Sequence, residues 1–156
     1  MENLESLCQK IQEFFELVEN HENQIQDWII ASKKPCSSIV NQSLFYRAIL
    51  QESTFDNSSI IGFENFEGFK NGLAYEIFKS LQENLTILEN IRDKILSANE
   101  VLWEKCKYIE NVYYNLRAKN LIDLSLLNPC CPSLEHIVIW CEDIWRYYHS
   151  FYLQVT

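Results

Sequence analysis

The chain has 156 residues, a net charge of −9 and 47% hydrophobic residues. This length supports one domain with a real core, and the apolar content excludes a disordered chain. The net acidity argues against direct nucleic-acid binding, because binders of nucleic acid carry basic surfaces that neutralise phosphates. The sequence holds only 3 Gly and 3 Pro. We therefore expect few turns, long elements and an all-α protein.

The N-terminal sequence MENLESLCQKIQEFF has acids where a signal peptide needs bases. Nor does any apolar run reach the length of about 18 residues that a membrane span needs. We expect no membrane contact and a cytoplasmic and nuclear location. Of the six cysteines, Cys130, Cys131 and Cys141 come nearest to a metal site, together with His136, but their spacing matches no common zinc module. We expect neither a metal nor a cofactor.

The first helix is expected over residues 3–31, where apolar positions repeat every seven residues. The two rows are Leu4, Ile11, Val18 and Ile25, and Leu7, Phe14, His21 and Trp28. His21 is expected to be a core-edge histidine, with a pH-sensitive or partner-contacting role as the alternative. Pro35 is expected to end this helix, because proline lacks the amide donor that a helix interior needs.

A shorter helix is expected over residues 37–52. Residues 53–62 read as a loop, because they are rich in Ser, Asn and Asp. A short irregular turn of helix, limited by Gly68 and Gly72, completes the segment 53–72.

Residues 73–119 carry the clearest pattern in the chain, an uninterrupted seven-residue repeat. The first row is Ala74, Leu81, Leu88, Ile95, Leu102, Ile109 and Leu116, and the companion row is Phe78, Leu85, Arg92, Asn99, Cys106 and Tyr113. Two such rows form the seam of a helix about 65 Å long that packs against other helices. Arg92 and Asn99 interrupt the companion row. We expect them either to fix register or partner choice, or to lie at the exposed edge of the stripe.

A connector over residues 120–132 leads to a terminal helix over residues 133–154, with Ser133 as N-cap and Glu135 in the first turn. This helix is apolar almost all round. A small domain cannot surround such a helix, so a partner covers the extra face or the rest of the chain does. The expected partner-binding residues are Ile139, Trp140, Arg146, Tyr147, Tyr148, Phe151 and Tyr152.

Taken together, the patterns predict a single all-α domain over residues 1–156. Its architecture is expected to be an elongated helical bundle, or coiled-coil-like hairpin, of about four helices with one very long central helix. The three histidines stand in no catalytic motif, and neither a P-loop nor a G-x-S-x-G sequence occurs. We expect no enzymatic activity.

The C-terminal half resembles a known family. LTILENIRDKI (residues 85–95) is similar to part of the long helix of the AIRIM family, and FEN at Phe63 is similar to an element before that helix. NPCCPSLEHIVIWCEDIWRYYHSFYL (residues 128–153) matches the family's connector and last helix. The matching positions are Pro129, Pro132, Ser133, Trp140, Asp143, Ile144, Arg146, Tyr148, Tyr152 and Leu153. The resemblance covers residues 63–153.

The resemblance implies an adaptor. AIRIM proteins are ribosome-maturation factors that work with AAA ATPases and a cyclin-dependent-kinase-interacting helical protein on precursors of the large ribosomal subunit. The complex releases a shuttling assembly factor, and the pre-ribosomal particle is contacted indirectly. Members of the family continue past the final Tyr-Leu with a basic segment, whereas this chain ends at Thr156. A partner contact carried by such a segment is therefore not expected here.

A second reading uses the heptad rows alone. In that reading the chain is a self-associating coiled-coil protein, a structural subunit or a tether, whose seam pairs with copies of itself. Sedimentation of the pure chain separates the two readings, because a stable homodimer at micromolar concentration favours self-association.

Overall fold

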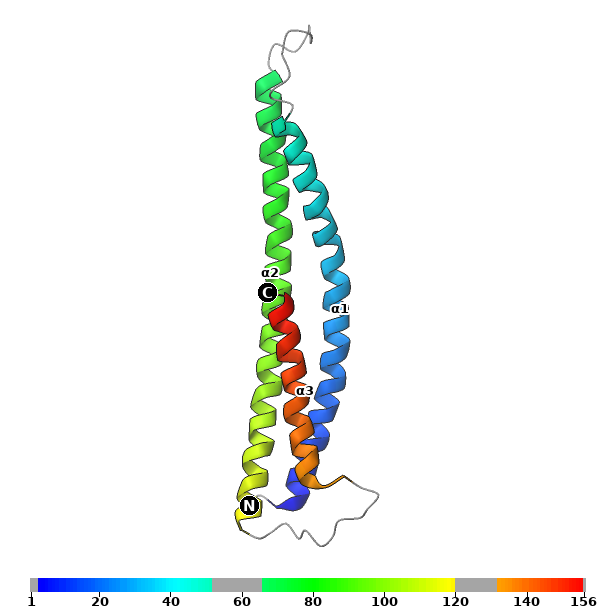
Figure 1. Ribbon diagram of the computed structural model, residues 1–156, viewed down its shortest axis with the longest axis vertical. Helices are drawn as coiled ribbons and strands as arrows, with labels where there is room; N and C mark the ends of the chain where they lie inside the picture. Colours follow the sequence, from blue (N-terminus) through cyan, green and yellow to red (C-terminus); the bar gives the residue numbers. More distant parts are fainter. Residues whose placement is uncertain (1–2, 52–65, 120–131, 156) are drawn as a thin grey trace. The chain divides into compact units, whose positions relative to one another are not determined.

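The computed structural model describes residues 3–51, 66–119 and 132–155, and every element in them is an α-helix. α1 spans Leu4–Gln51, α2 spans Phe66–Ala118 and α3 spans Leu134–Val155 (Figure 1). The expected all-α class is confirmed, but the described residues form three helices instead of about four. The expected loop over 53–62 lies outside the described residues, as does almost all of the connector over 120–132.

The helix count differs because Pro35 lies inside α1 instead of ending it. A proline in a helix removes one hydrogen bond and crowds the carbonyl four residues earlier, at a cost of about 3 kcal/mol. Contacts with α2 offset this cost. Pro35 is buried, and both Ser38 and Gln42, within two turns after it, hydrogen-bond to α2. Tertiary packing therefore allows the helix to continue past Pro35, where the sequence pattern predicts its end.

α2 begins at Phe66, before the expected start at residue 73, and it includes both Gly68 and Gly72. The expectation that these glycines limit a separate short turn is wrong. Each glycine costs a helix about 1 kcal/mol relative to alanine, which is small beside the cooperative extension of a long helix. A Cβ atom at Gly72 would meet nothing within 4 Å. Packing therefore does not require glycine at this position.

α1 and α2 both run through two compact units of the chain. Unit 1 consists of Met1–Asp27 and Arg92–Thr156, and unit 2 consists of Trp28–Ile91. Each unit has packing of its own. The assignment of residues 1–156 to a single domain stays a prediction.

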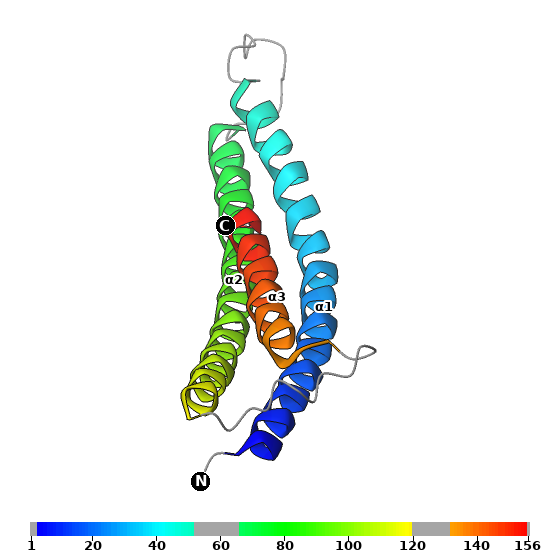
Figure 2. The same cartoon turned by 60° about the horizontal axis from the view of Figure 1, so that its bottom comes forward.

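Unit 1 is a three-helix bundle. Its part of α1 and its part of α2 run antiparallel, and α3 lies along both of them (Figures 1 and 2). The bundle has a continuous apolar core, because an apolar stripe of each of its three helices faces inward. The buried apolar side chains of unit 1 are Leu7, Ile11, Phe14, Ile25, Ile95, Leu102, Cys106, Ile109, Val112, Tyr113, Leu116, Val138, Cys141 and Tyr148.

Unit 2 is an antiparallel hairpin of α1 and α2, and its seam combines half-buried apolar side chains with hydrogen-bonded polar ones. The Gln42 side-chain amide donates to the Ser80 hydroxyl at 2.6 Å. The Asn84 amide donates to the Ser38 hydroxyl at 3.2 Å and to the Ser80 carbonyl at 2.9 Å. Ile77 is the most deeply buried hydrophobic side chain among the described residues of unit 2, at 8% exposure. These hydrogen bonds between the two helices add to the apolar contacts that hold the hairpin together.

Candidate partner-binding surface

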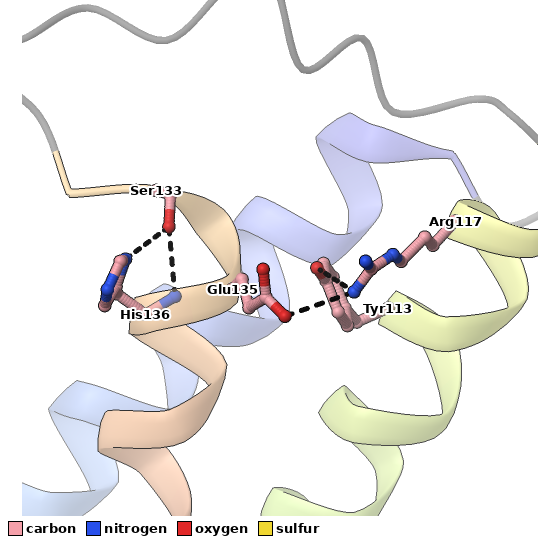
Figure 3. Close-up of polar contacts among 5 residues, drawn as sticks. All are labelled: Tyr113, Arg117, Ser133, Glu135 and His136. Carbon is pink, nitrogen blue, oxygen red and sulfur yellow. Dashed lines mark hydrogen bonds and ion pairs between the residues drawn. The ribbon is translucent and has the colours of Figure 1, made fainter.

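α3 is fixed at its N-terminus by contacts that its sequence indicates. The Ser133 hydroxyl accepts a hydrogen bond from the His136 amide at 3.3 Å, as an N-cap residue does, and also contacts the His136 ring (Figure 3). Glu135 pairs with Arg117 of α2 at 3.1 Å, and Arg117 reaches the Tyr113 hydroxyl at 3.5 Å. The ion pair is about half exposed, so we expect it to orient α3 more than to stabilise it.

The inner side of α3 packs into the core of unit 1. Val138, Cys141 and Tyr148 are buried there. The Trp145 ring lies 4.1 Å from the Trp103 ring of α2, measured between centroids. Aromatic contacts of this kind add to the free energy gained by burying the rings. α3 therefore presents a fixed face to solvent.

That solvent side carries several large apolar side chains, of which Leu153 and Val155 lie near the C-terminal end of the helix. Ile139 and Trp140 are each 47% exposed, and Tyr147 is 67% exposed. Arg146 is exposed beside them and pairs with Glu142 at 2.8 Å. Residues seven apart lie on one side of a helix, so Ile139 with Arg146 and Trp140 with Tyr147 form two adjacent columns. We call these four residues the outer face of α3.

The other three expected partner-binding residues lie elsewhere on the helix. Tyr148 is only 6% exposed and belongs to the core. Phe151 and Tyr152 are half-buried, between the core and the outer face. The seven expected partner-binding residues thus comprise four exposed residues, the buried Tyr148, and two half-buried residues at the edge of the outer face. The sequence did not separate them, because a helix that is apolar almost all round does not mark its solvent side.

Tyr148 joins a polar cluster inside the core of unit 1. Its hydroxyl donates to the Glu22 carboxylate at 2.6 Å, and its ring meets the His21 ring edge-on at 4.4 Å between centroids. Its backbone carbonyl accepts a hydrogen bond from the Asn99 amide at 3.0 Å. We call His21, Glu22, Asn99 and Tyr148 the core polar cluster. It connects α1, α2 and α3 within unit 1.

Burial sets the electrostatics of this cluster. It lowers the pKa of His21, because desolvation disfavours the imidazolium, while the neighbouring Asn99 side chain and Glu22 oppose the shift. Burial and the hydrogen bond to Glu22 raise the pKa of Tyr148, and that hydrogen bond lowers the pKa of Glu22. His21 Nε2 and Asn99 Oδ1 are buried without a hydrogen-bond partner among the described residues. Such orphaned atoms reduce stability, and a polar group in a seam commonly specifies register.

The two residues expected to interrupt the seam have different positions. Asn99 is 3% exposed and lies in the core of unit 1. Arg92 is partly exposed, and its guanidinium pairs with the adjacent Asp93 at 2.9 Å. The sequence pattern located both polar residues in the companion row. It did not indicate that Asn99 and His21 would meet, although both stood on apolar stripes.

Two of the described cysteines are buried in the core of unit 1. Burial raises the pKa of Cys106 to about 11 and that of Cys141 to about 12, so both stay protonated at neutral pH. Cys130 and Cys131 lie outside the described residues. Within residues 3–51, 66–119 and 132–155, no three side chains of the types His, Cys, Asp and Glu gather as a metal site. The same residues contain no helix apolar enough over a sufficient length to cross a membrane.

Comparison with known proteins decides the family. The family model described as ribosome biogenesis protein C1orf109-like matches residues 5–156. The chain belongs to this C1orf109-like family. The match confirms the resemblance to AIRIM proteins and extends it to almost the whole chain, including the N-terminal part of α1. No curated protein and no solved structure matches the chain.

Membership of the C1orf109-like family places the protein in ribosome biogenesis. Together with the geometry of α3, it makes the outer face the best candidate for a functional site. Tyr, Trp and Arg dominate the binding energy of protein interfaces, and the outer face contains all three. Neighbouring apolar residues exposed together on a packed helix are typical of a surface that another protein covers.

Proposed function

We propose that this protein is a non-enzymatic adaptor subunit of a AAA ATPase complex that acts in large ribosomal subunit maturation. The complex releases a shuttling assembly factor from pre-ribosomal particles, and the ATPases supply the nucleotide chemistry. The observation that carries the adaptor role is the outer face of α3, with Trp140 and Tyr147 exposed on a helix whose other side is fixed in a core.

The partners in this proposal are AAA ATPases and a cyclin-dependent-kinase-interacting helical protein. The AIRIM resemblance supports both, and the family match supports the ribosomal setting. The chain reaches the pre-ribosomal large subunit through these partners and not through RNA, because its net charge of −9 opposes phosphate binding. The proposed locations are the cytoplasm and the nucleus, where large-subunit precursors are assembled and completed.

The docking surface in this proposal is Ile139, Trp140, Arg146 and Tyr147, with Phe151 and Tyr152 at its edge. Tyr148 contributes indirectly, because its contacts with α1 and α2 hold α3 in place. Asn99 fixes the register of α3 through the same residue. Arg92 is the second register or partner-choice residue, at the exposed end of the unit 1 seam.

The experiment is a tagged pull-down from cells of the source organism, read by mass spectrometry, with the wild type and the double variant Trp140→Ala/Tyr147→Ala. The wild type is expected to recover AAA ATPases together with the kinase-interacting protein. The double variant is expected to lose them roughly tenfold or more, since two interface anchors are removed. Its helicity and melting temperature stay close to wild type, because both side chains are exposed.

A matched control removes exposed side chains from another helix of unit 1. Val101 is 45% exposed and Tyr114 is 54% exposed, both on α2. Val101→Ala/Tyr114→Ala is expected to keep the partners. Recovery of the chain without ATPases would overturn the adaptor function. A stable homodimer of the pure chain at micromolar concentration would instead support the self-associating coiled-coil reading.

A further inference from the structure

The aromatic column of the outer face lies on one flank of α3. Glu135 pairs with Arg117, so the side of α3 that carries Glu135 borders α2. Trp140 follows Glu135 by five residues and lies about 140° further round the helix. Tyr147 shares the column of Trp140, and its ring contacts the ring of the buried Tyr148 at 5.2 Å between centroids. Trp140 and Tyr147 are therefore on the flank of α3 that lies away from α2.

α1 borders that flank with a column of its own. Glu22 accepts a hydrogen bond from the Tyr148 hydroxyl at 2.6 Å, so the side of α1 that carries Glu22 faces α3. Cys8 and Phe15 precede Glu22 at seven-residue spacing and lie on the same side. Both are exposed, Phe15 at 38%. The line where α1 and α3 meet thus exposes apolar side chains of both helices.

Carboxylates lie among these apolar side chains. Asp143 follows Trp140 by three residues and lies beside it on the surface of α3, and Glu19 follows Phe15 by four residues on α1. In the part of the chain that the structure describes, neither Glu19, Glu22 nor Asp143 forms an ion pair. We call the following residues the α1–α3 surface: Phe15, Glu19, Glu22, Trp140, Asp143 and Tyr147.

The bases of the two helices do not balance these carboxylates. Within unit 1, α1 contains Lys10 alone, which pairs with Glu13 at 2.8 Å on the side where Lys105 of α2 also acts on Glu13. α3 contains Arg146 alone, which lies in the other column of the outer face and pairs with Glu142 at 2.8 Å. Residues 120–132 contain neither Lys nor Arg. The α1–α3 surface is therefore both apolar and negatively charged.

We propose that the α1–α3 surface docks a basic amphipathic helix of a partner protein. That helix places apolar side chains on Phe15, Trp140 and Tyr147, and lysine or arginine side chains against the carboxylates of α1 and α3. The inference rests on the proposed function, because it names the chemistry of the partner that the outer face of α3 binds. It also adds one side of α1 to the docking surface.

The test uses three synthetic peptides of about three heptads. The first has leucine at the seam positions and lysine at the flanking positions, the second has glutamate in place of lysine, and the third is a scrambled form of the first. Binding to the full chain is measured by fluorescence anisotropy at several salt concentrations. The basic amphipathic peptide is expected to bind roughly tenfold more tightly than either of the others and to weaken as salt is added. Failure of this peptide to bind, or binding no tighter than that of the scrambled peptide, overturns the proposal.

Charge variants test the carboxylates. Glu19→Gln/Asp143→Asn is expected to weaken binding of the basic peptide roughly fivefold or more and to reduce its salt dependence. Glu100→Gln/Glu104→Gln is the matched control, because it removes the same charge from two exposed positions of α2, and it is expected to bind like the wild type. Glu19→Lys/Asp143→Lys is expected to prefer the acidic peptide. Equal weakening by the two neutral variants would assign the attraction to the net charge of the whole chain and overturn the proposal.

Apolar variants test the side chains between the carboxylates. Phe15→Ala is expected to weaken binding of the basic peptide roughly threefold or more, and Trp140→Ala/Tyr147→Ala roughly tenfold or more, with helicity preserved because all three positions are exposed. Val101→Ala/Tyr114→Ala is expected to bind like the wild type. Binding that none of the surface variants weakens places the peptide elsewhere and contradicts the proposal.

The peptide assay and the pull-down fail in different ways. A chain that recovers ATPases from cells but shows no preference for the basic peptide keeps the adaptor function and loses this inference. A chain that prefers the basic peptide but recovers no ATPases loses the adaptor function and keeps the basic-helix chemistry of the surface. A dimer of the pure chain that Trp140→Ala/Tyr147→Ala abolishes makes a second copy the occupant and overturns the proposal.

Discussion

The parts of α1 and α2 in unit 1 and in unit 2 come from the same two helices, yet they pack differently. In unit 1 a third helix lies against both, and Phe14, Leu102 and Ile109 are almost fully buried. In unit 2 only two helices pack, and a ladder of amide and hydroxyl hydrogen bonds joins them, with Ile77 buried beside it. The heptad pattern is common to both units. What differs is the number of helices that cover it.

This comparison shows that an apolar heptad pattern alone does not tell whether its side chains are buried. Phe78 and Cys106 occupy equivalent positions of one row, but one is 60% exposed and the other 2%. The hydrophobic free energy depends on the area removed from water, about 25 cal/mol per Å². Unit 1 therefore gains more hydrophobic free energy from burial, and unit 2 leaves large apolar side chains exposed.

The largest expected effect tests this difference in stability directly. Leu102→Ala in unit 1 is expected to cost about 3–5 kcal/mol of unfolding free energy, because it leaves a cavity in a three-helix core. Ile77→Ala in unit 2 is expected to cost about 2 kcal/mol, at the lower end for such changes. Urea unfolding measures both variants, and the exposed-site variant Leu85→Ala serves as control. A larger loss for Ile77→Ala than for Leu102→Ala would contradict the comparison.

Pro35→Ala is expected to strengthen unit 2. The change restores an amide donor inside α1 and is expected to stabilise that stretch by up to about 3 kcal/mol, less the lost packing of the buried ring. Native-state hydrogen exchange should show slower exchange for residues 28–51 and little change in unit 1. The control Ser37→Ala alters an exposed neighbour in the same helix. Faster exchange in Pro35→Ala would mean that the ring's packing outweighs the missing hydrogen bond.

Gly72→Ala is expected to give a smaller gain in the same unit, about 0.5–1 kcal/mol. The new methyl group has open space around it, so the gain comes from lower backbone entropy in the unfolded chain. Thermal unfolding followed by circular dichroism measures the shift. Gly72→Val provides the control at the same position and should gain less, because a β-branched side chain loses rotamer freedom in a helix. No gain from alanine would show that α2 is not ordered as a helix at this point.

The smallest expected effect is a dependence of unit 1 on pH. Burial lowers the pKa of His21, so the unfolded chain binds the proton more tightly than the folded chain. Stability should therefore fall as the pH drops below the ordinary histidine value of about 6.5, and the fall ends below the folded pKa. His21→Phe should remove this slope in urea midpoints measured from pH 8 downward. A slope that persists in this variant would assign the titration to another group.

Glu22 acts in a separate pH window. The Tyr148 hydrogen bond lowers the pKa of Glu22. The contribution of Glu22 to the stability of the fold is therefore present above the ordinary pKa of a carboxyl group and is lost as the pH falls through the lowered pKa. Tyr148→Phe removes that hydrogen bond while keeping the ring. The two windows can be separated, because only the Glu22 window should change in Tyr148→Phe.

The chain's own pattern determined much of this protein. Few glycines and prolines, together with unbroken heptads, predicted an all-α chain with a very long helix. Ser133 and Glu135 marked the start of α3, because capping and the helix dipole act within one turn. The motifs in residues 63–153 indicated the family that the match over residues 5–156 confirms. These features are local, so sequence alone could specify them.

Only the tertiary structure decided the rest. In the tertiary structure α1 continues past Pro35, because contacts with α2 offset the local free-energy cost of a proline inside a helix. The tertiary structure divided the apolar residues of α3 into a buried Tyr148 and an exposed outer face, and it brought His21 to Asn99 across the bundle. It also left Phe78 and Leu85 in solvent. Each outcome depends on which helix covers which face, and that is a property of contacts between residues far apart in the chain.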